Sequence, residues 1–403
     1  MKPLYQPLNR LIGAAAITRF GDGFFSIGVT WLIYVQTHSV LLLGGLWGAY
    51  LLLVAGLTSV LGPMVDRRER RGLLVGISVV QAVLVLMPPA LALVHAFQLW
   101  ELYPTFLLVG LVRIPAGSAI SSMVPGLAGD EPLPAANARL AGATEAMYLV
   151  GPAVGGVFLA YFGALSGLVV NGATFAAAAL LLASLPRASA PAPAAAERYR
   201  SAVWVGFLVL WRDGRLRRLA GLAILVSFTD AAFIVLSVPL VRTILHGTTA
   251  GVGFLEGSLS AGVLVGAWLV RRQTLGAWPR LRQALVVLFC AATAVIGLVP
   301  LLAWALATQI VAGIADGVFQ VEWEVAFQQD VSDAQRGRAF MGQRAAARLA
   351  SAIGAVLAAL VAAATGVAAA FLVLGVCGAA LASSILYSLW RRGAESAGVT
   401  PVP

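Results

Sequence analysis

GPMVDRRERR, residues 62–71, is a run of charged residues between two long apolar stretches. A helix that spans lipid must satisfy its backbone hydrogen bonds internally, and it cannot hold so many charges cheaply. We therefore predict a tight loop at a membrane face, with a membrane-spanning helix on each side. Because arginines gather on cytoplasmic loops, we expect this loop on the cytoplasmic side.

The composition favours a membrane protein and excludes several other classes. Hydrophobic residues make up 60% of the chain and charged residues 11%, against roughly 25% charged residues in an ordinary soluble domain. The mean hydropathy is +0.91. Lysine occurs once, at Lys2, so a phosphate-binding loop that ends in Lys-Ser or Lys-Thr is excluded. We expect no cofactor, and any active transport must draw on an ion gradient or on another subunit.

Twelve apolar runs are long enough to cross about 30 Å of hydrocarbon, which takes about 20 helical residues. We predict spans at 11–35, 40–62, 72–95, 102–124, 139–161, 164–185, 217–241, 250–270, 283–300, 301–325, 340–362 and 367–390. With the amino terminus inside, all but three of the 27 basic residues fall on cytoplasmic segments, as the positive-inside rule requires. The exceptions are Arg19, Arg113 and Arg242. The sequence thus predicts an all-α protein of the cytoplasmic membrane with both termini in the cytoplasm.

A segment rich in Pro and Ala divides the chain into two sets of six helices. We predict a first bundle over 1–185, a cytoplasmic linker over 186–214, and a second bundle with a cytoplasmic tail over 215–403. The end of the linker, with Phe207 and Trp211 followed by arginines, suits a helix that lies in the membrane interface.

The two halves also repeat one another in sequence. The first and seventh predicted helices carry the same residues at a constant offset. Phe20, Asp22 and Phe25 of the first helix correspond to Phe228, Asp230 and Phe233 of the seventh. Gly151-Pro-Ala-Val-Gly-Gly in the fifth helix has a weaker echo in Gly354-Ala-Val-Leu-Ala-Ala of the eleventh. Parallel repeats of this kind predict two pseudo-symmetric six-helix bundles around a central cavity, with the substrate site at the membrane midplane.

Several motifs resemble one family of transporters. The charged loop carries the pattern Gly-x-x-x-Asp-Arg-x-x-Arg-Arg at Gly62, Asp66, Arg70 and Arg71, with Glu69 where Gly is usual. In the fourth helix, Arg113-Ile-Pro-Ala-Gly117 fits an Arg-x-x-x-Gly element. A fifth-helix element associated with antiporters is matched by Gly142, Gly151, Pro152, Gly155 and Gly156. Together these motifs resemble the major facilitator superfamily.

Within that superfamily, three further pieces are similar to the group that exports macrolides and siderophores. They are Gly21-Asp22, Asn137-Ala138 and Arg336-Gly337-Arg338. The resemblance implies a drug:proton antiporter that works by alternating access. It also implies that Asp66 latches a cytoplasmic gate against the eleventh helix, although the loop could instead be only a solvated run of charges. Gly151-Pro152 and Gly155-Gly156 remove side chains and one helical hydrogen bond, so the fifth helix either bends there to gate the cavity or uses these small residues only to pack against another helix.

Ionisable residues inside the predicted spans are the candidate site, since a charge at the bilayer centre costs at least ~2.5 kcal/mol. The candidates for proton coupling are Asp22, Arg113, Glu145, Asp230 and Asp316. Asp22 either pairs with Arg19, which shares its helix face, or gains and loses a proton as the protein changes conformation. Arg113 keeps its charge and needs a partner, for which we expect Glu145 on the next helix.

Aromatic residues of the spans are candidates for lining the cavity with an apolar surface. We single out Phe25, Trp31, Tyr148 and Phe233, although aromatic residues of membrane helices also face lipid or pack against each other. The three histidines are expected at outer helix ends, too scattered for a metal site.

We interpret the chain as a secondary transporter, not an enzyme, that exports small apolar or amphipathic compounds in exchange for protons. One alternative is a dedicated exporter of a siderophore or a lipid-like metabolite on the same fold. Another is an importer or symporter of polar solutes, which would need more polar side chains along its helices. The expected partners are a small-molecule substrate, protons and the lipid bilayer, with no nucleic acid, and the chain is expected to be a monomer.

Overall fold

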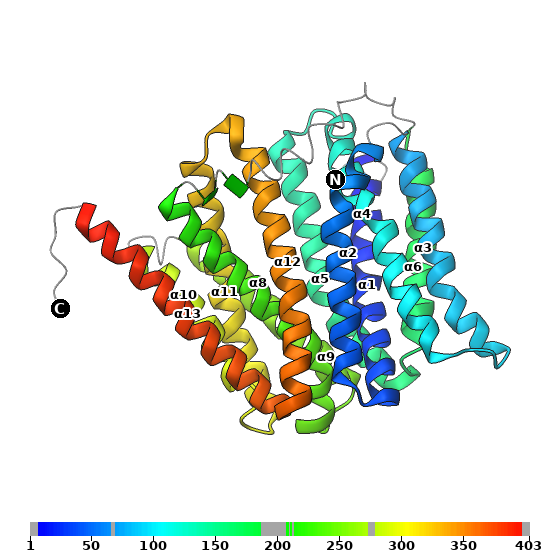
Figure 1. Cartoon of the computed structure of the whole chain (residues 1–403). Coiled ribbons are helices and arrows are strands. Elements are labelled where there is room, and N and C mark those ends of the chain that lie inside the picture. The colour runs from blue at the N-terminus through cyan, green and yellow to red at the C-terminus, as the bar shows by residue number, and fades with distance from the viewer. Residues whose placement is uncertain are drawn as a thin grey trace. The chain divides into compact units, whose positions relative to one another are not determined.

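The computed structural model describes residues 7–65, 69–186, 207–208, 210–211, 213–272 and 279–396, and side chains are not described at 58–65, 279, 280, 282 and a few positions near 333–338 and 392–396. Over these residues the chain is helical, with no strand (Figure 1). Asp66 and most of the predicted linker lie outside the described residues.

Six helices form the first half of the chain. They are α1 (Pro7–Thr37), α2 (Val40–Val65), α3 (Arg70–Leu93), α4 (Leu102–Leu127), α5 (Leu133–Phe162) and α6 (Ser166–Ala183), with a short 3₁₀ turn η1 (Leu99–Glu101) before α4. The second half also has six long helices in its described part. They are α8 (Gly214–Pro239), α9 (Thr249–Arg271), α10 (Pro279–Val295), α11 (Leu302–Asp330), α12 (Asp333–Thr365) and α13 (Val367–Ser396), and a π-helical turn η2 (Leu240–Ile244) continues α8. Each of the twelve predicted spans coincides with one of these helices, which confirms the predicted fold class.

Several helices extend beyond their predicted spans. α5 begins at Leu133 rather than at residue 139, and it accommodates Pro134 in its first turn, where a missing N–H breaks no helical hydrogen bond. α12 begins at Asp333 rather than at residue 340. Because hydropathy reports only the apolar part of a helix, it misses the polar turns that continue past the membrane.

The surface of these helices is suited to lipid. Ten of the described helices are long and apolar enough to cross a membrane. Large apolar side chains point outward, with Leu180 74% exposed, Val83 63% and Leu52 50%. Such a surface would be unstable in water, whereas lipid tails solvate it. The chain is therefore a multi-pass membrane protein.

Contacts between residues divide the chain into two compact units. The N-unit comprises Met1–Ser39, Leu52–Ala196 and Gly247–Gly257. The C-unit comprises Val40–Leu51, Glu197–His246 and Ser258–Pro403. The boundary between the units thus runs through α2 and α9.

The same packing pattern occurs in both units. In the N-unit, α1 packs on α5 and α6, and α3 packs on α4 and α6. In the C-unit, α8 packs on α12 and α13, and α10 packs on α11 and α13. These pairs correspond helix by helix when the two halves are aligned in chain order. The internal repeat seen in the sequence is thus a repeat of structure.

One crossing point shows how closely the repeat is kept. Gly151 of α5 lies against the backbone of Phe20 in α1, and a Cβ atom at Gly151 would lie 2.7 Å from the Phe20 carbonyl oxygen. Gly354 of α12 lies in the same way against the backbone of Phe228 in α8. Small residues at such crossings let two membrane helices approach each other. Asp22 and Asp230 each follow this crossing by two residues.

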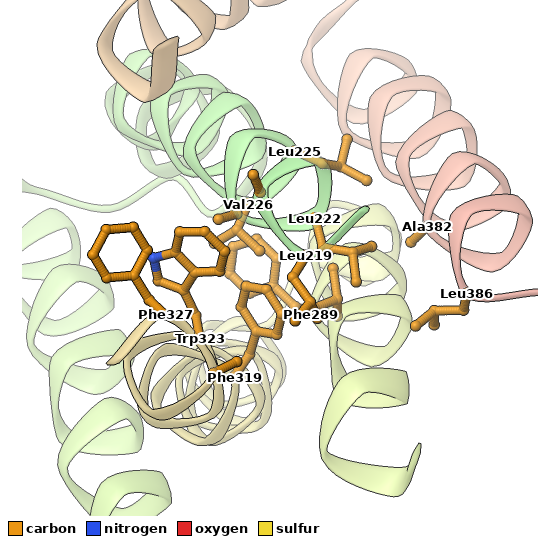
Figure 2. Close-up of a cluster of buried hydrophobic side chains, with 14 of the residues drawn as sticks. Leu219, Leu222, Leu225, Val226, Phe289, Phe319, Trp323, Phe327, Ala382 and Leu386 are labelled. Atoms are coloured by element: carbon orange, nitrogen blue, oxygen red, sulfur yellow. The ribbon is translucent and has the colours of Figure 1, made fainter. Parts of the chain in front are cut away.

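Each unit has its own apolar core. In the C-unit, Phe289, Phe319 and Trp323 pack with leucines of α8 such as Leu219 and Leu222 (Figure 2). In the N-unit, a core of smaller side chains joins α1, α3, α4, α5 and α6.

The three histidines of the chain end helices. His38 follows α1, His95 follows α3 and His246 follows η2. They have φ values of 50°, 57° and 49°, and they are the non-glycine residues with positive φ in the described part of the chain. Histidine enters this left-handed region more readily than most residues, and here it follows the end of a helix at the connection to the next element.

Candidate functional site

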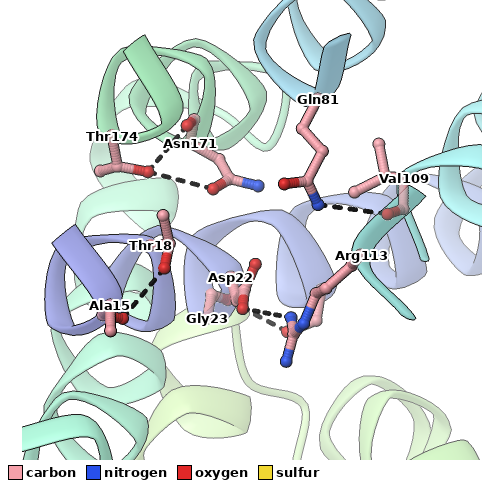
Figure 3. Close-up of polar contacts among 10 residues, drawn as sticks. Ala15, Thr18, Asp22, Gly23, Gln81, Val109, Arg113, Asn171 and Thr174 are labelled. Carbon is pink, nitrogen blue, oxygen red and sulfur yellow. Dashed lines mark hydrogen bonds and ion pairs between the residues drawn. The ribbon is translucent and has the colours of Figure 1, made fainter. Parts of the chain in front are cut away.

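An ion pair between α1 and α4 is the most prominent polar contact inside the predicted spans. Arg113 Nη1 donates a hydrogen bond to Asp22 Oδ2 (Figure 3). The two side chains are largely buried, with 34% of Arg113 and 19% of Asp22 exposed. The ion pair that the structure contains joins Arg113 to Asp22, and the expected pairing of Arg113 with Glu145 stays a prediction. Asp22 receives a partner from another helix rather than only from Arg19 on its own.

More charged residues surround this pair. Arg19 interacts electrostatically with Asp22 and Arg113, and also with Glu145 and Tyr148 of α5. Two arginines and two carboxylates from three helices therefore make one charge cluster in the N-unit. Such a cluster is close to neutral as a whole, which lowers the cost of placing it within a membrane.

Uncharged polar residues lie behind the pair, and the sequence interpretation missed them. Gln81 of α3 donates a hydrogen bond through Nε2 to the carbonyl oxygen of Val109, at 3.2 Å. In α6, Thr174 Oγ1 donates to the backbone oxygen of Asn171 at 2.7 Å and to its Oδ1 at 3.2 Å. Gln81 and Asn171 are 3% and 0% exposed. Their signal in the sequence is that each is the one amide side chain of its helix.

Asp230 and Asp316, which we predicted as coupling residues, belong to the C-unit. Asp230 lies in α8 and Asp316 in α11, near enough for their charges to interact. Gln320 Nε2 donates to Asp316 Oδ2 at 2.7 Å, whereas Asp316 Oδ1 is buried with no hydrogen-bond partner among the described residues. No ion pair in the described part of the chain joins either aspartate to a basic residue.

The glycine-rich element of α5 makes close helix contacts in the N-unit. Gly155 lies against Phe24 of α1, and Gly156 lies against the start of α9, where Thr249 Oγ1 donates to the Gly156 carbonyl oxygen at 2.8 Å. Pro152 stands inside α5, which the structure gives as one helix from Leu133 to Phe162. The predicted bending of this helix as a gate stays a prediction.

Two other glycines of the predicted motifs differ from these. A Cβ atom added at Gly117 of α4 or at Gly142 of α5 would meet no atom within 4 Å. Close packing therefore does not account for glycine at either position.

The charged loop is described from Glu69 onward. Glu69 caps α3 by accepting a hydrogen bond from the Gly72 N–H at 2.9 Å, which gives a structural role to the residue that replaces the usual glycine. Arg70 Nη1 donates to the carbonyl oxygen of Ser122 in α4 at 2.9 Å, and Arg71 donates to that of Ala183 at the end of α6. Both arginines thus tie α3 to neighbouring helices. Asp66 lies outside the described residues, and for Gly62 the structure gives only its place in α2.

The predicted lining aromatics fall into different environments. Phe25 is buried and stacks on Phe106 with ring centroids 5.6 Å apart, and Phe233 is buried in the C-unit. Trp31 is half-buried, and Tyr148 is 49% exposed. Phe25 and Phe233 pack inside their units, and Tyr148 offers the most surface to a ligand.

Comparison with known families decides what kind of protein carries this cluster. The Major Facilitator Superfamily model matches residues 11–341. The chain belongs to the major facilitator superfamily. It is therefore a transporter of this superfamily and not an enzyme.

Solved structures of other superfamily transporters have the same fold. The nucleoside transporter NupG has a TM-score of 0.71 and 11% identity, with 94% of this chain and 98% of that chain covered. A bacterial homolog of the human lysosomal transporter Spinster, inward-facing and occupied, has a TM-score of 0.74 and 13% identity, covering 97% and 98%. An inward-facing bacterial homologue of the iron transporter ferroportin has 0.68 and 16%, covering 96% and 99%. At such identities the likeness concerns the fold alone.

One curated relative within the superfamily has a named activity. The multidrug efflux pump Tap of Mycolicibacterium fortuitum is 28% identical over 224 residues, which are 53% of this chain and 54% of the relative. The match thus spans about half the length of that relative.

Proposed function

We propose that this transporter exports small apolar or amphipathic compounds across the cytoplasmic membrane in exchange for protons, by alternating access. The Asp22–Arg113 ion pair inside two predicted spans is the observation that carries the proposal. A carboxylate held by an arginine is stable as an ion, whereas a carboxyl that has lost this partner is more easily protonated in a medium of low dielectric constant. A conformational change that alters the pairing would therefore move a proton.

Arg113 is well suited to be the fixed partner in this exchange. Its guanidinium stays charged under all physiological conditions, so proton uptake falls on the carboxylates. Arg19 adds a second positive charge near Asp22. Protonation of Asp22 would leave the cluster with excess positive charge. This charge would destabilise the conformation and favour one that releases the proton on the other side of the membrane.

Two further observations support the proposed direction and cargo. The relative named as a multidrug efflux pump favours export, and the scarcity of polar side chains along the spans favours apolar or amphipathic cargo. A dedicated exporter of one siderophore or lipid-like metabolite would use the same fold.

Proton exchange can be measured in everted vesicles that hold the full chain and a preset proton gradient. Addition of ethidium or erythromycin should dissipate the gradient, and Asp22→Asn should slow this by about 5- to 150-fold, the range of ordinary coupling free energies. Glu131→Gln is the matched control, because Glu131 also pairs with an arginine, at 2.7 Å, but outside the predicted spans. Exchange by Asp22→Asn at the wild-type rate would make Asp22 a structural residue.

Cargo range is measured separately in cells that lack their own efflux pumps. Resistance to dyes and macrolides together would support the proposed multidrug export. Resistance to iron chelators alone would favour the dedicated exporter.

A further inference from the structure

We propose that Gln81 and Asn171 are positioning residues. They keep α1 and α4 aligned so that Asp22 and Arg113 stay paired, and they thereby set the pH at which Asp22 takes up a proton and the ion pair breaks. This inference rests on the proposed proton exchange. It concerns two helices, α3 and α6, which contribute no charge to the cluster in the middle of their spans.

Gln81 holds the turn of α4 from which Arg113 projects. Its Nε2 donates to the carbonyl oxygen of Val109 at 3.2 Å. Val109 precedes Arg113 by four residues, so in an α-helix the same carbonyl accepts the N–H of Arg113. A shift of this turn would therefore move the base of the arginine side chain.

Asn171 and Thr174 lie against the corresponding turn of α1. Gly21 directly precedes Asp22, and it lets these two side chains of α6 approach the helix closely. A Cβ atom at Gly21 would lie 2.5 Å from Asn171 Oδ1 and would also collide with Thr174 Oγ1. Polar side chains of α6 thus pack directly against α1 next to Asp22.

The amide groups of Asn171 and Gln81 face each other between the two turns. Since Asn171 Oδ1 accepts from Thr174, the amide nitrogen points away from Thr174, and Figure 3 shows it directed toward Gln81. This nitrogen is buried, and it has no hydrogen-bond partner among the described residues. Two hydrogen-bonded pairs, Thr174–Asn171 in α6 and Gln81–Val109 between α3 and α4, thus face each other next to the ion pair, and we call these four residues the polar bridge.

Stability does not account for amides at these positions. A buried donor without a partner costs free energy, and an apolar side chain of similar shape would avoid that cost. Both residues are nonetheless amides on otherwise amide-free helices. Their chemistry is thus explained better by the alignment of the two turns than by packing.

Placement, rather than added charge, is how the bridge would act on Asp22. The charged or titratable groups near Asp22 are Arg19 on its own helix, Arg113 on α4, and, through Arg19, Glu145 and Tyr148 on α5. From α6 the bridge contributes only uncharged groups. Because the energy of an ion pair depends on the distance between its charges, a small shift between α1 and α4 changes how tightly the carboxylate is held.

Infrared titration tests this inference without any cargo. The carboxyl band of Asp22, assigned by its loss in Asp22→Asn, is followed against pH in the purified full chain in liposomes. In Asn171→Leu and in Gln81→Leu, we expect the midpoint to move to higher pH by about one unit, a tenfold gain in proton affinity, because Arg113 holds the carboxylate less well. Thr105→Val is the control, since this buried hydroxyl at the start of α4 donates to the Glu101 carbonyl oxygen of the preceding turn η1, four residues earlier in the chain.

A double variant separates positioning from general packing. Asn171→Gln combined with Gln81→Asn exchanges the two amides and should return the midpoint toward the wild-type value. Wild-type midpoints in both leucine variants, or an equal shift in Thr105→Val, would overturn the inference. If a leucine variant does not fold, Asn171→Ala and Gln81→Ala are measured in the same way.

Failure of the proposed function gives a different result. Wild-type vesicles that exchange no protons for ethidium or erythromycin would contradict proton-coupled export. The band midpoints would still show whether the bridge sets the ionisation of Asp22.

Discussion

The N-unit and the C-unit place an aspartate at the same point of the same packing pattern, but only the N-unit gives it an arginine. Asp22 follows the crossing of α1 with Gly151 and pairs with Arg113. Asp230 follows the crossing of α8 with Gly354 and has no ion pair in the described part of the chain, while its charged neighbour is a second aspartate. The repeat has preserved backbone geometry and allowed the chemistry of the two units to diverge.

The residue before each aspartate also differs between the units. Gly21 leaves room for the polar side chains of α6. Its counterpart Thr229 carries a side chain of its own, which donates to the Leu225 carbonyl oxygen at 3.0 Å and lies 4.0 Å from the sulfur of Cys290. The two units thus differ in the polar groups next to each aspartate as well as in its charged partner.

The largest expected effect is on the ion pair itself. Asp22→Asn should lower the stability of the protein by about 2 kcal/mol, less than the 3–5 kcal/mol of a fully buried pair because about a third of Arg113 is exposed. The loss in Asp22→Asn combined with Arg113→Gln should be smaller than the sum of the two single losses, by about 1 kcal/mol. Thermal unfolding in detergent measures this cycle, and additive losses would contradict a direct pair.

Substitution of the crossing glycines Gly151 and Gly354 should lower stability slightly less, and by the same amount in both units. Gly151→Ala and Gly354→Ala each force a Cβ atom into the backbone of the facing helix, and we expect each to cost about 1–2 kcal/mol. Gly117→Ala is the matched control, because a methyl group there meets no atom and should stabilise its helix by about 0.5–1 kcal/mol. A loss at Gly151 without a loss at Gly354 would break the equivalence of the units.

Neutralising Asp316 in the C-unit should raise the stability of the protein instead of lowering it. Asp316→Asn keeps an acceptor for Gln320, and it removes a charge that has a buried oxygen without a partner. We expect stability to rise by about 1 kcal/mol, measured again by thermal unfolding. A loss as large as that of Asp22→Asn would mean that the aspartate has a cationic partner after all.

The smallest effect is expected at the cap of α3. Glu69→Gly restores the usual family residue and removes the hydrogen bond to Gly72. Because glycine is itself an acceptable capping residue, stability should fall by only a few tenths of a kcal/mol. Hydrogen exchange of the first turn of α3 is sensitive enough to detect this, and unchanged exchange would show that the cap contributes nothing.

The number and order of the helices could be predicted from the sequence because lipid imposes a simple rule on length and polarity. The ends of the helices could not, since α12 begins with polar residues that a hydropathy pattern cannot separate from a loop. α10 was predicted to run to residue 300 and ends at Val295.

The members of the charge cluster were predictable because charges are rare in the spans, but the pairing was not. Spacing along α1 shows that Arg19 and Asp22 share a face. The contact between Asp22 and Arg113 depends on how α1 and α4 are rotated against each other, which no pattern within one helix determines. Gln81 and Asn171 were missed because a single amide in an apolar helix does not stand out as a charge does.

The left-handed histidines make three of the connections between helices hard to alter. His38 turns the chain back at once, so that only His38 and Ser39 separate α1 from α2. A β-branched residue in place of any of the three histidines would be strained, whereas asparagine or glycine would fit. An epitope or a fluorescent tag would have to be inserted elsewhere than between α1 and α2, because this corner offers an antibody or a protease almost no extended chain to bind.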